Sequence, residues 1–343
     1  MTHNEQRVGE AAIFDALAKS GPADRAFLRH RWFAVGNAPS ATSFVSTDDA
    51  GSPCAAFALV ERRKGPFVLR EVGGCYWPFR GVPVAPRIAA SDLSRALARH
   101  KNDLGRVWRL GPVETGDASL ETLIPASRMA GWQVLSRPLG KVFELDLAAL
   151  AADDGWPSTK TRRKNRWRKR RLEDDGGPLR TVFFSGADWS ADHRDAMARI
   201  EAASWLGKLG DGGDTKFRDP AMRRYWEDLC DDRVLAEMLF GSVMWIGDVP
   251  AAFTFGIQAG GVRYYIANNY DERFTQFGPG RVLLYEDFAR AAAHGTERIS
   301  WGLGDAGYKS EMGAKAGPDM VDLLFVRGAL LAAALRPWWE RPV

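Results

Sequence analysis

Residues 262–295, VRYYIANNYDERFTQFGPGRVLLYEDFARAAAHG, decide the fold. The run 262–269 is rich in β-branched and aromatic residues and predicts a strand. The run 279–294 has the apolar spacing of a helix and is followed by a glycine. Between them the Gly-Pro-Gly at 278–280 predicts a turn into the helix, because proline suits the first helical position. A helix start of this kind favours a bound anion, so the stretch predicts an α/β fold with a phosphate site.

Working outward from this stretch, we find the same order of elements twice in the chain. In both halves helices precede three antiparallel strands, which are followed by a helix, a strand and a final α/β piece. The turn-rich segment 153–157 (DDGWP) separates the halves. The sequence therefore predicts a duplicated α/β unit with two mixed, mainly antiparallel sheets flanked by helices. The predicted domains are 1–153 and 158–328, with a C-terminal tail at 329–343.

The strands and helices of the second half follow from the same patterns. Ser158 is expected to cap a helix that runs to Gly176. The elements expected after it are a strand at 179–184, helices at 190–204 and 219–231, strands at 233–240, 249–258 and 262–269, the helix at 279–294, and strands at 297–301 and 321–327. In the first half, two strands are expected close together, at 132–137 and 140–146.

Composition and charge exclude several classes of protein. The chain has 343 residues, 45 % apolar and 26 % charged, which is typical of globular domains rather than disordered or fibrous chains. No apolar run is long enough to cross a bilayer, and the first residues are too acidic for a secretory signal. Three cysteines without a CxxC pair, and five histidines without metal-ligand spacing, predict a reducing compartment and no metal site. We therefore expect a cytoplasmic location.

The net charge of +4 hides one strongly basic segment. Residues 160–171, KTRRKNRWRKRR, contain nine Lys or Arg and no acid, so the rest of the chain carries a net charge of −5. Trp167 and Leu172 are the only large apolar side chains of this helix, so it has no broad apolar face. Such a run favours a polyanionic neighbour. Three such partners remain possible from the sequence: the phosphates of coenzyme A, an anionic lipid headgroup or lipid-linked sugar, and RNA.

Three segments together carry a resemblance to a known family: 160–176 (KTRRKNRWRKRRLEDDG), 264–295, and 299–314 (ISWGLGDAGYKSEMGA). In order and spacing they resemble the CelD-like acetyltransferases, a bacterial family linked to cellulose and exopolysaccharide biosynthesis. That family has the GCN5-related N-acetyltransferase (GNAT) fold, and the resemblance covers 158–328. It implies a tandem GNAT arrangement, similar to that of the FemABX aminoacyltransferases, in which the first half is a degenerate copy.

The resemblance also implies a donor site. GNAT proteins hold the pyrophosphate of acetyl-CoA, or of another acyl-CoA, at the start of the helix after the fourth strand. The corresponding residues here are Gln276, Gly278, Gly280 and Arg281, with Lys309 as a further phosphate ligand. The sequence differs from the usual motifs in having Pro279 at a glycine position and Ser300-Trp301-Gly302 where the family has Asp-Phe-Gly.

Acyl transfer from a thioester needs help with two protons and with the developing oxyanion. By resemblance, Tyr308 is the expected acid for the departing thiolate, and Asp305 is the first candidate base, followed by Asp271. Asn268 and Asn269 are expected to contact the acyl carbonyl or the acceptor, and Tyr265 is placed with them as a substrate-binding residue. Each has a structural alternative: the Asn and Asp residues favour turns and caps, and a tyrosine is often a packing residue.

The sequence therefore predicts an acyl-CoA-dependent N- or O-acyltransferase acting on an amine or hydroxyl, with a polysaccharide or cell-envelope precursor as one option for the acceptor. Two alternatives stay open. One is a FemABX-like transferase that uses aminoacyl-tRNA. The other is a non-catalytic scaffold that binds through the basic helix 160–171, which would make the protein peripheral at the inner membrane.

Overall fold

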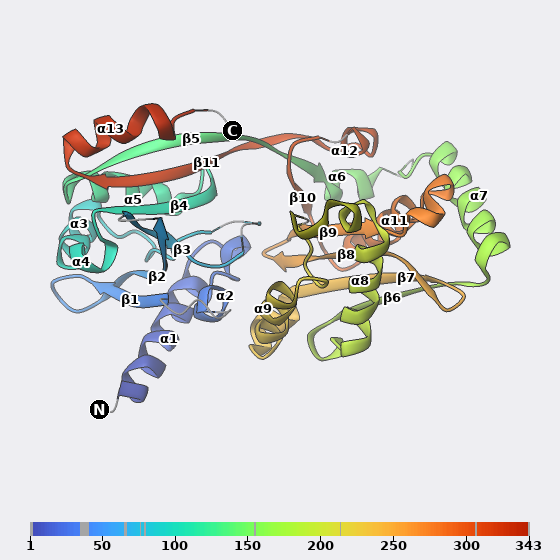
Figure 1. The fold of residues 1–343 in the computed structure, drawn as a ribbon, viewed down its shortest axis with the longest axis horizontal. Coiled ribbons are helices and arrows are strands. Elements are labelled where there is room, and N and C mark those ends of the chain that lie inside the picture. Colours follow the sequence, from blue (N-terminus) through green and yellow to red (C-terminus); the bar gives the residue numbers. More distant parts are fainter. Residues whose placement is uncertain are drawn as a thin grey trace. The chain divides into compact units, whose positions relative to one another are not determined.

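The computed structural model describes residues 3–34, 41–64, 67–75, 77–78, 80–153, 156–212, 214–305 and 307–341. Within it the chain forms two compact units, which we describe one at a time (Figure 1). The first unit comprises residues 1–143 together with 302–343, and the second comprises 144–301.

The first unit contains a sheet with the strand order β1-β2-β3-β4-β11-β5. Within it β3 and β4 are parallel, whereas β1–β2, β2–β3 and β4–β11 are antiparallel. Its strands are β1 (Ala41–Thr47), β2 (Pro53–Lys64), β3 (Phe67–Val72), β4 (Val107–Glu114), β5 (Trp132–Asp146) and β11 (Lys315–Arg327). Its helices are α1 (His3–Ser20), η1 (Ala23–Arg25), α2 (His30–Ala34), α3 (Ala90–Arg99), α4 (Lys101–Leu104), α5 (Ala118–Met129), α12 (Tyr308–Glu311) and α13 (Ala329–Trp339).

The second unit has the strand order β10-β9-β8-β7-β6, with β9 and β10 parallel and the other neighbours antiparallel. Its strands are β6 (Leu179–Ser185), β7 (Leu239–Ile246), β8 (Val249–Ala259), β9 (Val262–Tyr270) and β10 (Arg298–Leu303). Its helices are α6 (Leu147–Ala152), α7 (Thr159–Gly176), η2 (Gly186–Asp188), α8 (Ala191–Ala203), η3 (Trp205–Gly212), α9 (Pro220–Cys230), α10 (Arg233–Met238), η4 (Glu272–Phe277) and α11 (Pro279–Ala293).

Both units thus repeat one pattern, an antiparallel meander followed by a helix and a parallel strand. In the first unit α3 connects β3 to β4, and in the second α11 connects β9 to β10. The fold class expected from the sequence, mixed α/β with mainly antiparallel sheets flanked by helices, is confirmed.

The core of the second unit lies on both faces of β8. Helices α8 and α11 both contact this strand, and almost all of its residues are buried. A strand covered on both faces reads as a continuous apolar run rather than an alternation, as VPAAFTFGI does. Phe253 and Phe255 meet Phe217 edge-on, at ring distances of 6.0 and 5.0 Å.

The bounds of the compact units differ from those of the domains expected from the sequence. Strand β11 pairs with β4 of the first unit, from Met320–Glu114 to Val326–Val107. Residues 302–328, which the sequence groups with the C-terminal half, therefore lie in the first unit. The expected tail 329–343 contains α13, which packs on β11 through the buried ring of Trp339.

Two expected elements are wrong in detail. The strand expected at 233–240 is mostly helix α10, because the Asp232 carboxylate caps it by accepting from the amides of Val234 (2.9 Å) and Leu235 (3.1 Å). The two strands expected at 132–137 and 140–146 form the single strand β5.

Candidate functional site

Strand β9 bends away from β10 in the middle of the second unit. The parallel ladder covers three pairs only, from Val262–Arg298 to Tyr264–Ser300. Immediately beyond, the register with β8 shifts so that Ile266 is an extra residue, which is a β-bulge. Residues 266–270 of β9 therefore do not pair with β10, and their backbone N–H and C=O groups on this edge of the strand can bond to a ligand.

The bulge depends on a glycine in the neighbouring strand. Gly256 of β8 pairs with Tyr265, and a Cβ at position 256 would lie 2.0 Å from the carbonyl oxygen of Tyr264. The ring of Phe240 would be 2.7 Å from the same Cβ. No side chain fits there, so Gly256 permits the close approach of β9 that the bulge requires.

Beyond β9, the Gly-Pro-Gly turn starts α11 as the sequence predicts. Gly278 is left-handed at φ 60° and is the N-cap, and Pro279 is the first helical residue. No side chain caps this end, and the amides of Arg281 and Val282 bond to the Gly278 carbonyl at 3.1 and 3.3 Å. The amide of Gly280 and the positive end of the helix dipole are thus what the helix start offers to an anion.

The basic helix α7 lies against this turn. Its N-cap is Ser158, whose hydroxyl accepts from the amide of Thr161 at 3.2 Å, as expected. Arg168 is buried, and a Cβ at position 278 would be 3.5 Å from its Nε atom. Leu172 anchors the helix in an apolar cluster with residues of β7, β8 and α11. One guanidinium of the basic run is therefore held beside the start of α11.

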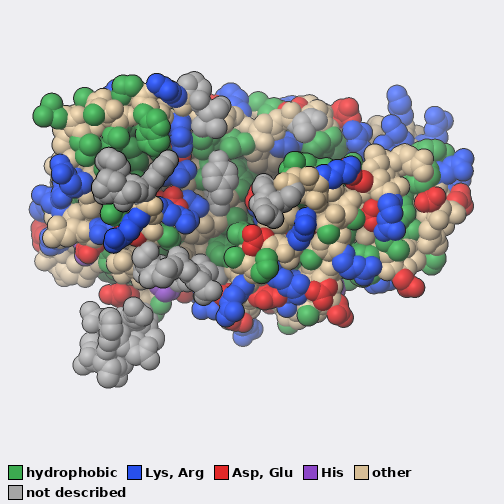
Figure 2. Space-filling model, viewed as in Figure 1, with side chains coloured by type: hydrophobic (Ala, Val, Ile, Leu, Met, Phe, Trp, Pro, Cys, Tyr) green, Lys and Arg blue, Asp and Glu red, His purple; other side chains and the backbone are tan. Residues whose placement is uncertain are grey.

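Most of the other cations of α7 are exposed. Figure 2 shows Lys and Arg side chains gathered over this helix, which Figure 1 labels. Lys169 is half-buried and pairs with Glu286 of α11. The remaining exposed cations are Lys160, Arg162, Arg163, Lys164, Arg166, Arg170 and Arg171.

The expected donor residues of the second unit lie around the same turn with different surroundings. Gln276 is exposed, and Arg281 is half-buried. Gly280 faces the ring of Tyr270, since a Cβ at position 280 would be 3.2 Å from the Cδ1 atom of that ring. Packing thus supplies a reason for Gly280 beside the expected one.

Asp271 is buried, caps η4 and pairs with the exposed Arg273. Its carboxylate accepts from the Arg273 amide at 3.0 Å, which starts η4, and from the guanidinium at 2.9 and 2.6 Å. The hydrogen bond to Asp271 raises the pKa of Arg273. These contacts favour the structural role of Asp271.

Tyr265 belongs to a buried polar network. Its hydroxyl donates to Asp287 of α11, and Asp287 also pairs with Arg263 at 2.9 Å. Burial, with the Asp287 carboxylate second, raises the pKa of Tyr265 well above its ordinary value. Burial likewise raises the pKa of Asp287, and the Arg263 guanidinium opposes this shift. Thr254 completes the network with a bond of 3.4 Å to Asp287.

The expected acceptor residues Asn268 and Asn269 lie beyond the bulge. They pair with Thr254 and Phe253 of β8, respectively. Asn269 is buried and Asn268 is half-buried. As successive residues of a strand, the two side chains point to opposite faces of the sheet, so one ligand on one face meets only one of them.

The remaining expected residues lie in the first unit, around α12. Asp305 is exposed and precedes this helix: it accepts from the amide of Gly307, the N-cap residue, at 2.8 Å and from the Ser310 hydroxyl. The bond from Ser310 lowers the pKa of Asp305, which weakens it as a base. Tyr308 is half-buried at the first position of α12.

Lys309 is buried and donates to three backbone carbonyls. These belong to Gly302, Leu303 and Gly304, at 3.3, 3.2 and 2.6 Å. Burial lowers the pKa of Lys309 to about 8. These bonds hold the backbone at 302–304, and the role of Lys309 as a phosphate ligand stays a prediction.

The structure thus brings together Gln276, Gly278, Gly280, Arg281 and Asp271 at one turn, and places Asp305, Tyr308 and Lys309 together on a segment of the other unit. Sequence analysis did not single out Arg168 or the Arg263–Asp287 pair. Arg263 is a charged residue within the apolar run VRYYI, which is a signal of buried pairing, whereas nothing in the sequence around Asp287 marks it as buried.

Comparison with known proteins gives one family match and several similar folds. The fold defines a class of protein with two similar α/β units, in one of which the parallel strands β9 and β10 separate beside the start of α11. Residues 159–310 match the family model described as an acetyltransferase (GNAT) domain. This part of the chain is therefore similar to a GNAT acetyltransferase domain. No curated protein matches the sequence.

Two solved structures resemble almost the whole chain. The crystal structure of FemX is 11 % identical, with a TM-score of 0.62 over 95 % of this chain and 98 % of that one. The structure of L-PGS from Bacillus licheniformis is 13 % identical, with a TM-score of 0.52 over 96 % of each chain. At these identities the likeness shows the fold alone.

Two kinds of feature are absent from the described ranges. No group of three or more His, Cys, Asp or Glu side chains there is placed to hold a metal ion. No helix of that part is both long and apolar enough to cross a membrane.

Proposed function

We propose that the protein is an acyltransferase whose donor, an acyl-CoA, binds in the second unit along the opened edge of β9. One observation carries the proposal: the bulged edge at Ile266 leads to the start of α11, where the buried Arg168 lies beside Gly278. The edge offers backbone groups to an extended ligand, as a neighbouring strand would. The helix start, Arg168 and Arg281 offer positive charge to its phosphates.

The proposed reaction is direct transfer. An amine or hydroxyl of the acceptor attacks the thioester carbonyl, the C–S bond breaks, and a C–N or C–O bond forms. The acceptor loses one proton and the thiolate gains one. Because Asp305 and Asp271 already accept hydrogen bonds from their own segments, water is the proposed proton acceptor.

Tyr308 stays the proposed proton donor to the thiolate, on the strength of its sequence motif. General acid catalysis contributes about 100- to 10,000-fold to a rate. We expect Tyr308→Phe to lower kcat by at least about 100-fold while leaving the KM for the donor within a factor of about three. A loss of only a few-fold would remove Tyr308 from this role.

Calorimetric titration tests the donor site. Acetyl-CoA and a longer acyl-CoA are titrated into the wild type and into Arg168→Gln, Arg281→Glu and Arg170→Gln. A charge-assisted hydrogen bond is worth about 1.5–3 kcal/mol, so we expect Arg168→Gln to weaken binding by about 10- to 100-fold. Arg170 is exposed on the same helix and serves as the matched control. Unchanged binding by Arg168→Gln and Arg281→Glu, in variants that melt like the wild type, would contradict the site.

The acceptor rests on the sequence resemblance: an amine or hydroxyl of a polysaccharide or cell-envelope precursor. Such an acceptor would bring the protein to the inner membrane surface as a peripheral protein. Acyl transfer to soluble glycan precursors, followed by mass spectrometry, tests this part separately from donor binding.

A second candidate is a transferase that uses aminoacyl-tRNA, and the exposed cations of α7 favour it. A protein that neutralises several phosphates loses affinity steeply with salt. Reversing Arg162, Arg166 and Arg170 to Glu would then abolish tRNA binding, and nuclease treatment would abolish activity. Tight acyl-CoA binding with no measurable tRNA binding would exclude this candidate.

A further inference from the structure

A cavity lies in the second unit, at the other end of α11 from Gly278. Its volume is about 700 Å³, and its walls come from β6, α10, β7, β8, β9 and the end of α11. Helix α11 has 15 residues and is therefore about 22 Å long. The cavity is thus separate from the Gly-Pro-Gly turn at 278–280, which we call the donor turn. The lining residues are Phe183, Phe184, Ser185, Arg233, Val234, Glu237, Met238, Phe240, Gly241, Gln258, Arg263, Arg290 and His294.

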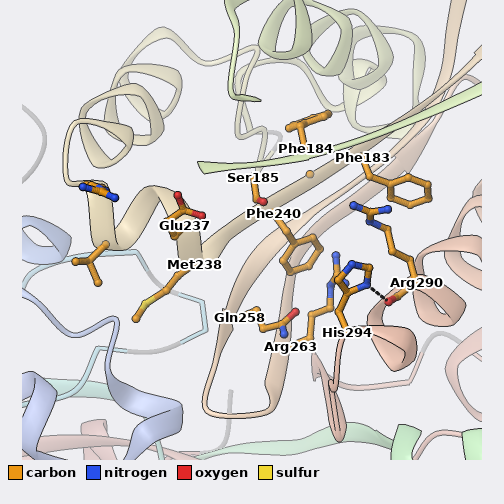
Figure 3. A pocket seen from close by; sticks show the side chains of 13 residues that line it. Phe183, Phe184, Ser185, Glu237, Met238, Phe240, Gln258, Arg263, Arg290 and His294 are labelled. Carbon is orange, nitrogen blue, oxygen red and sulfur yellow. Dashed lines mark hydrogen bonds between the residues drawn. The ribbon is translucent and has the colours of Figure 1, made fainter. Parts of the chain in front are cut away.

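Charge in this cavity is unbalanced. Its lining contains three guanidinium groups, those of Arg233, Arg263 and Arg290, and one carboxylate, that of Glu237. Figure 3 shows Arg263, Arg290 and His294 on one side of the cavity and Glu237 and Met238 on the other. The cavity therefore attracts anions.

Arg263 is built into the wall. Its side chain is only 7 % exposed, its NH2 atom lies 2.9 Å from the Oδ1 atom of Asp287, and its guanidinium lies 3.6 Å from the ring centre of Phe240. Asp287 is in turn fixed by Tyr265. The guanidinium thus has one position and little entropy left to lose on binding a ligand.

This fixed guanidinium keeps an unused donor. The Nε–H of Arg263 is buried and has no hydrogen-bond acceptor in the described structure. An unsatisfied buried donor is unfavourable and calls for a partner, such as a bound ion or water. Asp287 does not line the cavity, so an anion entering it meets Arg263 without meeting that carboxylate.

Apolar side chains cover much of the rest of the wall. Phe183 and Phe240 stack with Arg290 and Arg263 at 5.0 and 3.6 Å, and Val234 and Met238 come from α10. Rings that already face guanidinium groups form a surface on which a flat or aliphatic group packs beside an anion. A purely inorganic ion would leave this surface uncovered.

We propose that this cavity is a binding site for a small organic anion, one that joins a carboxylate or a phosphate to an apolar group. The anion lies against Arg263 with Arg233 and Arg290 at the rim, and the apolar group lies on Phe240 and Phe183. The site is distinct from the donor turn.

The probes are phenyl phosphate, phenylacetate and inorganic phosphate, titrated calorimetrically into the full chain. We expect at least one of the two aromatic anions to bind at least 10-fold more tightly than inorganic phosphate; which of them does so assigns the anion as phosphate or carboxylate. Equal binding of inorganic phosphate, or no binding of either aromatic anion at millimolar concentration, would overturn the proposal.

Two exposed arginines allow a test that spares the fold. We expect the double variant Arg233→Glu, Arg290→Glu to weaken the bound probe by at least 10-fold, and Arg170→Glu on α7 to leave it unchanged. Equal loss in both variants would show a general charge effect and contradict the site.

Acyl-CoA titration of the double variant separates the two sites, because the donor turn keeps all of its residues. Loss of acyl-CoA binding there would contradict two distinct sites, whereas failure of acyl-CoA to bind the wild type would bear on the donor proposal alone.

Discussion

Gly256 shows how one residue type sets the geometry of the opened strand. A methyl group at this position would overlap the carbonyl oxygen of Tyr264 at 2.0 Å and press on Phe240. Overpacking of a core typically costs 1–3 kcal/mol, and a clash with backbone costs more than one with a flexible side chain. We expect Gly256→Ala to lower the free energy of unfolding by about 3 kcal/mol or more, measured by urea denaturation.

The matched control is Gly116→Ala, because no atom lies within 4 Å of a Cβ at that position. It should change stability by less than about 0.5 kcal/mol. Comparable losses in the two variants would show that the close approach at the bulge is not what requires glycine at 256.

Lys309 gives a pH dependence whose sign follows from its lowered pKa. The value is about 8 in the folded chain against 10.5 for the free side chain, with burial as the main cause. Between pH 8 and pH 10.5 the unfolded chain binds more protons than the folded chain, so the free energy of unfolding rises with pH. This gain is lost as the pH falls through 8. We expect the stability of the wild type relative to Lys309→Met to increase from pH 8 to pH 10.5. A flat or opposite difference would show that the bonds to the three carbonyls keep the ammonium charged.

Among the elements, one buried carboxylate on β11 links this strand to arginines of β4 and β5. Asp322 of β11 is fully buried and accepts from Arg109 at 2.8 Å and from Arg137 at 2.5 Å. Removing one partner of a buried ion pair typically costs about 3–5 kcal/mol, because the other charges stay buried. We expect Asp322→Asn to destabilise the first unit by that amount in thermal or urea unfolding.

Asp319 on the same strand is the control. It is exposed and pairs with the exposed Lys141 at 3.0 Å, and such pairs are worth about 0–1 kcal/mol. Similar effects of Asp319→Asn and Asp322→Asn would mean that the arginines near Asp322 find water or other partners when the carboxylate is lost.

At the scale of the whole molecule, the two units differ in what lies at their parallel strand pair. In the first unit the β3–β4 ladder is also short, ending at Glu71–Arg109. There the following chain bonds to the neighbouring strands: the Arg80 amide donates to the Pro112 carbonyl at 3.1 Å, and the Ala56 amide to the Pro83 carbonyl at 3.0 Å. The chain's own backbone thus uses groups that an extended ligand would need.

This difference predicts one donor site per chain. We expect calorimetric titration with acyl-CoA to give a stoichiometry of one and a single affinity, and Arg168→Gln to weaken all of the binding. A second binding event that survives this substitution would place a donor in the first unit and contradict the degenerate role expected for that half.

The local features could be predicted from the sequence because each depends on residues that are close together along the chain. Ser158 as a cap, the Gly-Pro-Gly start of α11 and the apolar run of β8 depend on neighbours along the chain. The strand expected at 233–240 failed because Val234 and Leu235 read equally well as strand or helix, and the cap from Asp232 decided between them.

The sequence by itself therefore determined the order of the elements, the repeated α/β pattern, the basic helix and the turn at 278–280. Three features needed the three-dimensional structure: β11 pairs with β4, Arg168 lies beside Gly278, and Tyr265 donates to Asp287. The physical reason is that an edge strand accepts any partner with matching alternation, and that a charged or polar side chain reads the same whether it meets solvent, a ligand or a buried counter-charge. Which of these it meets is fixed by residues distant in sequence, through close packing and the cost of leaving a buried polar group unpaired.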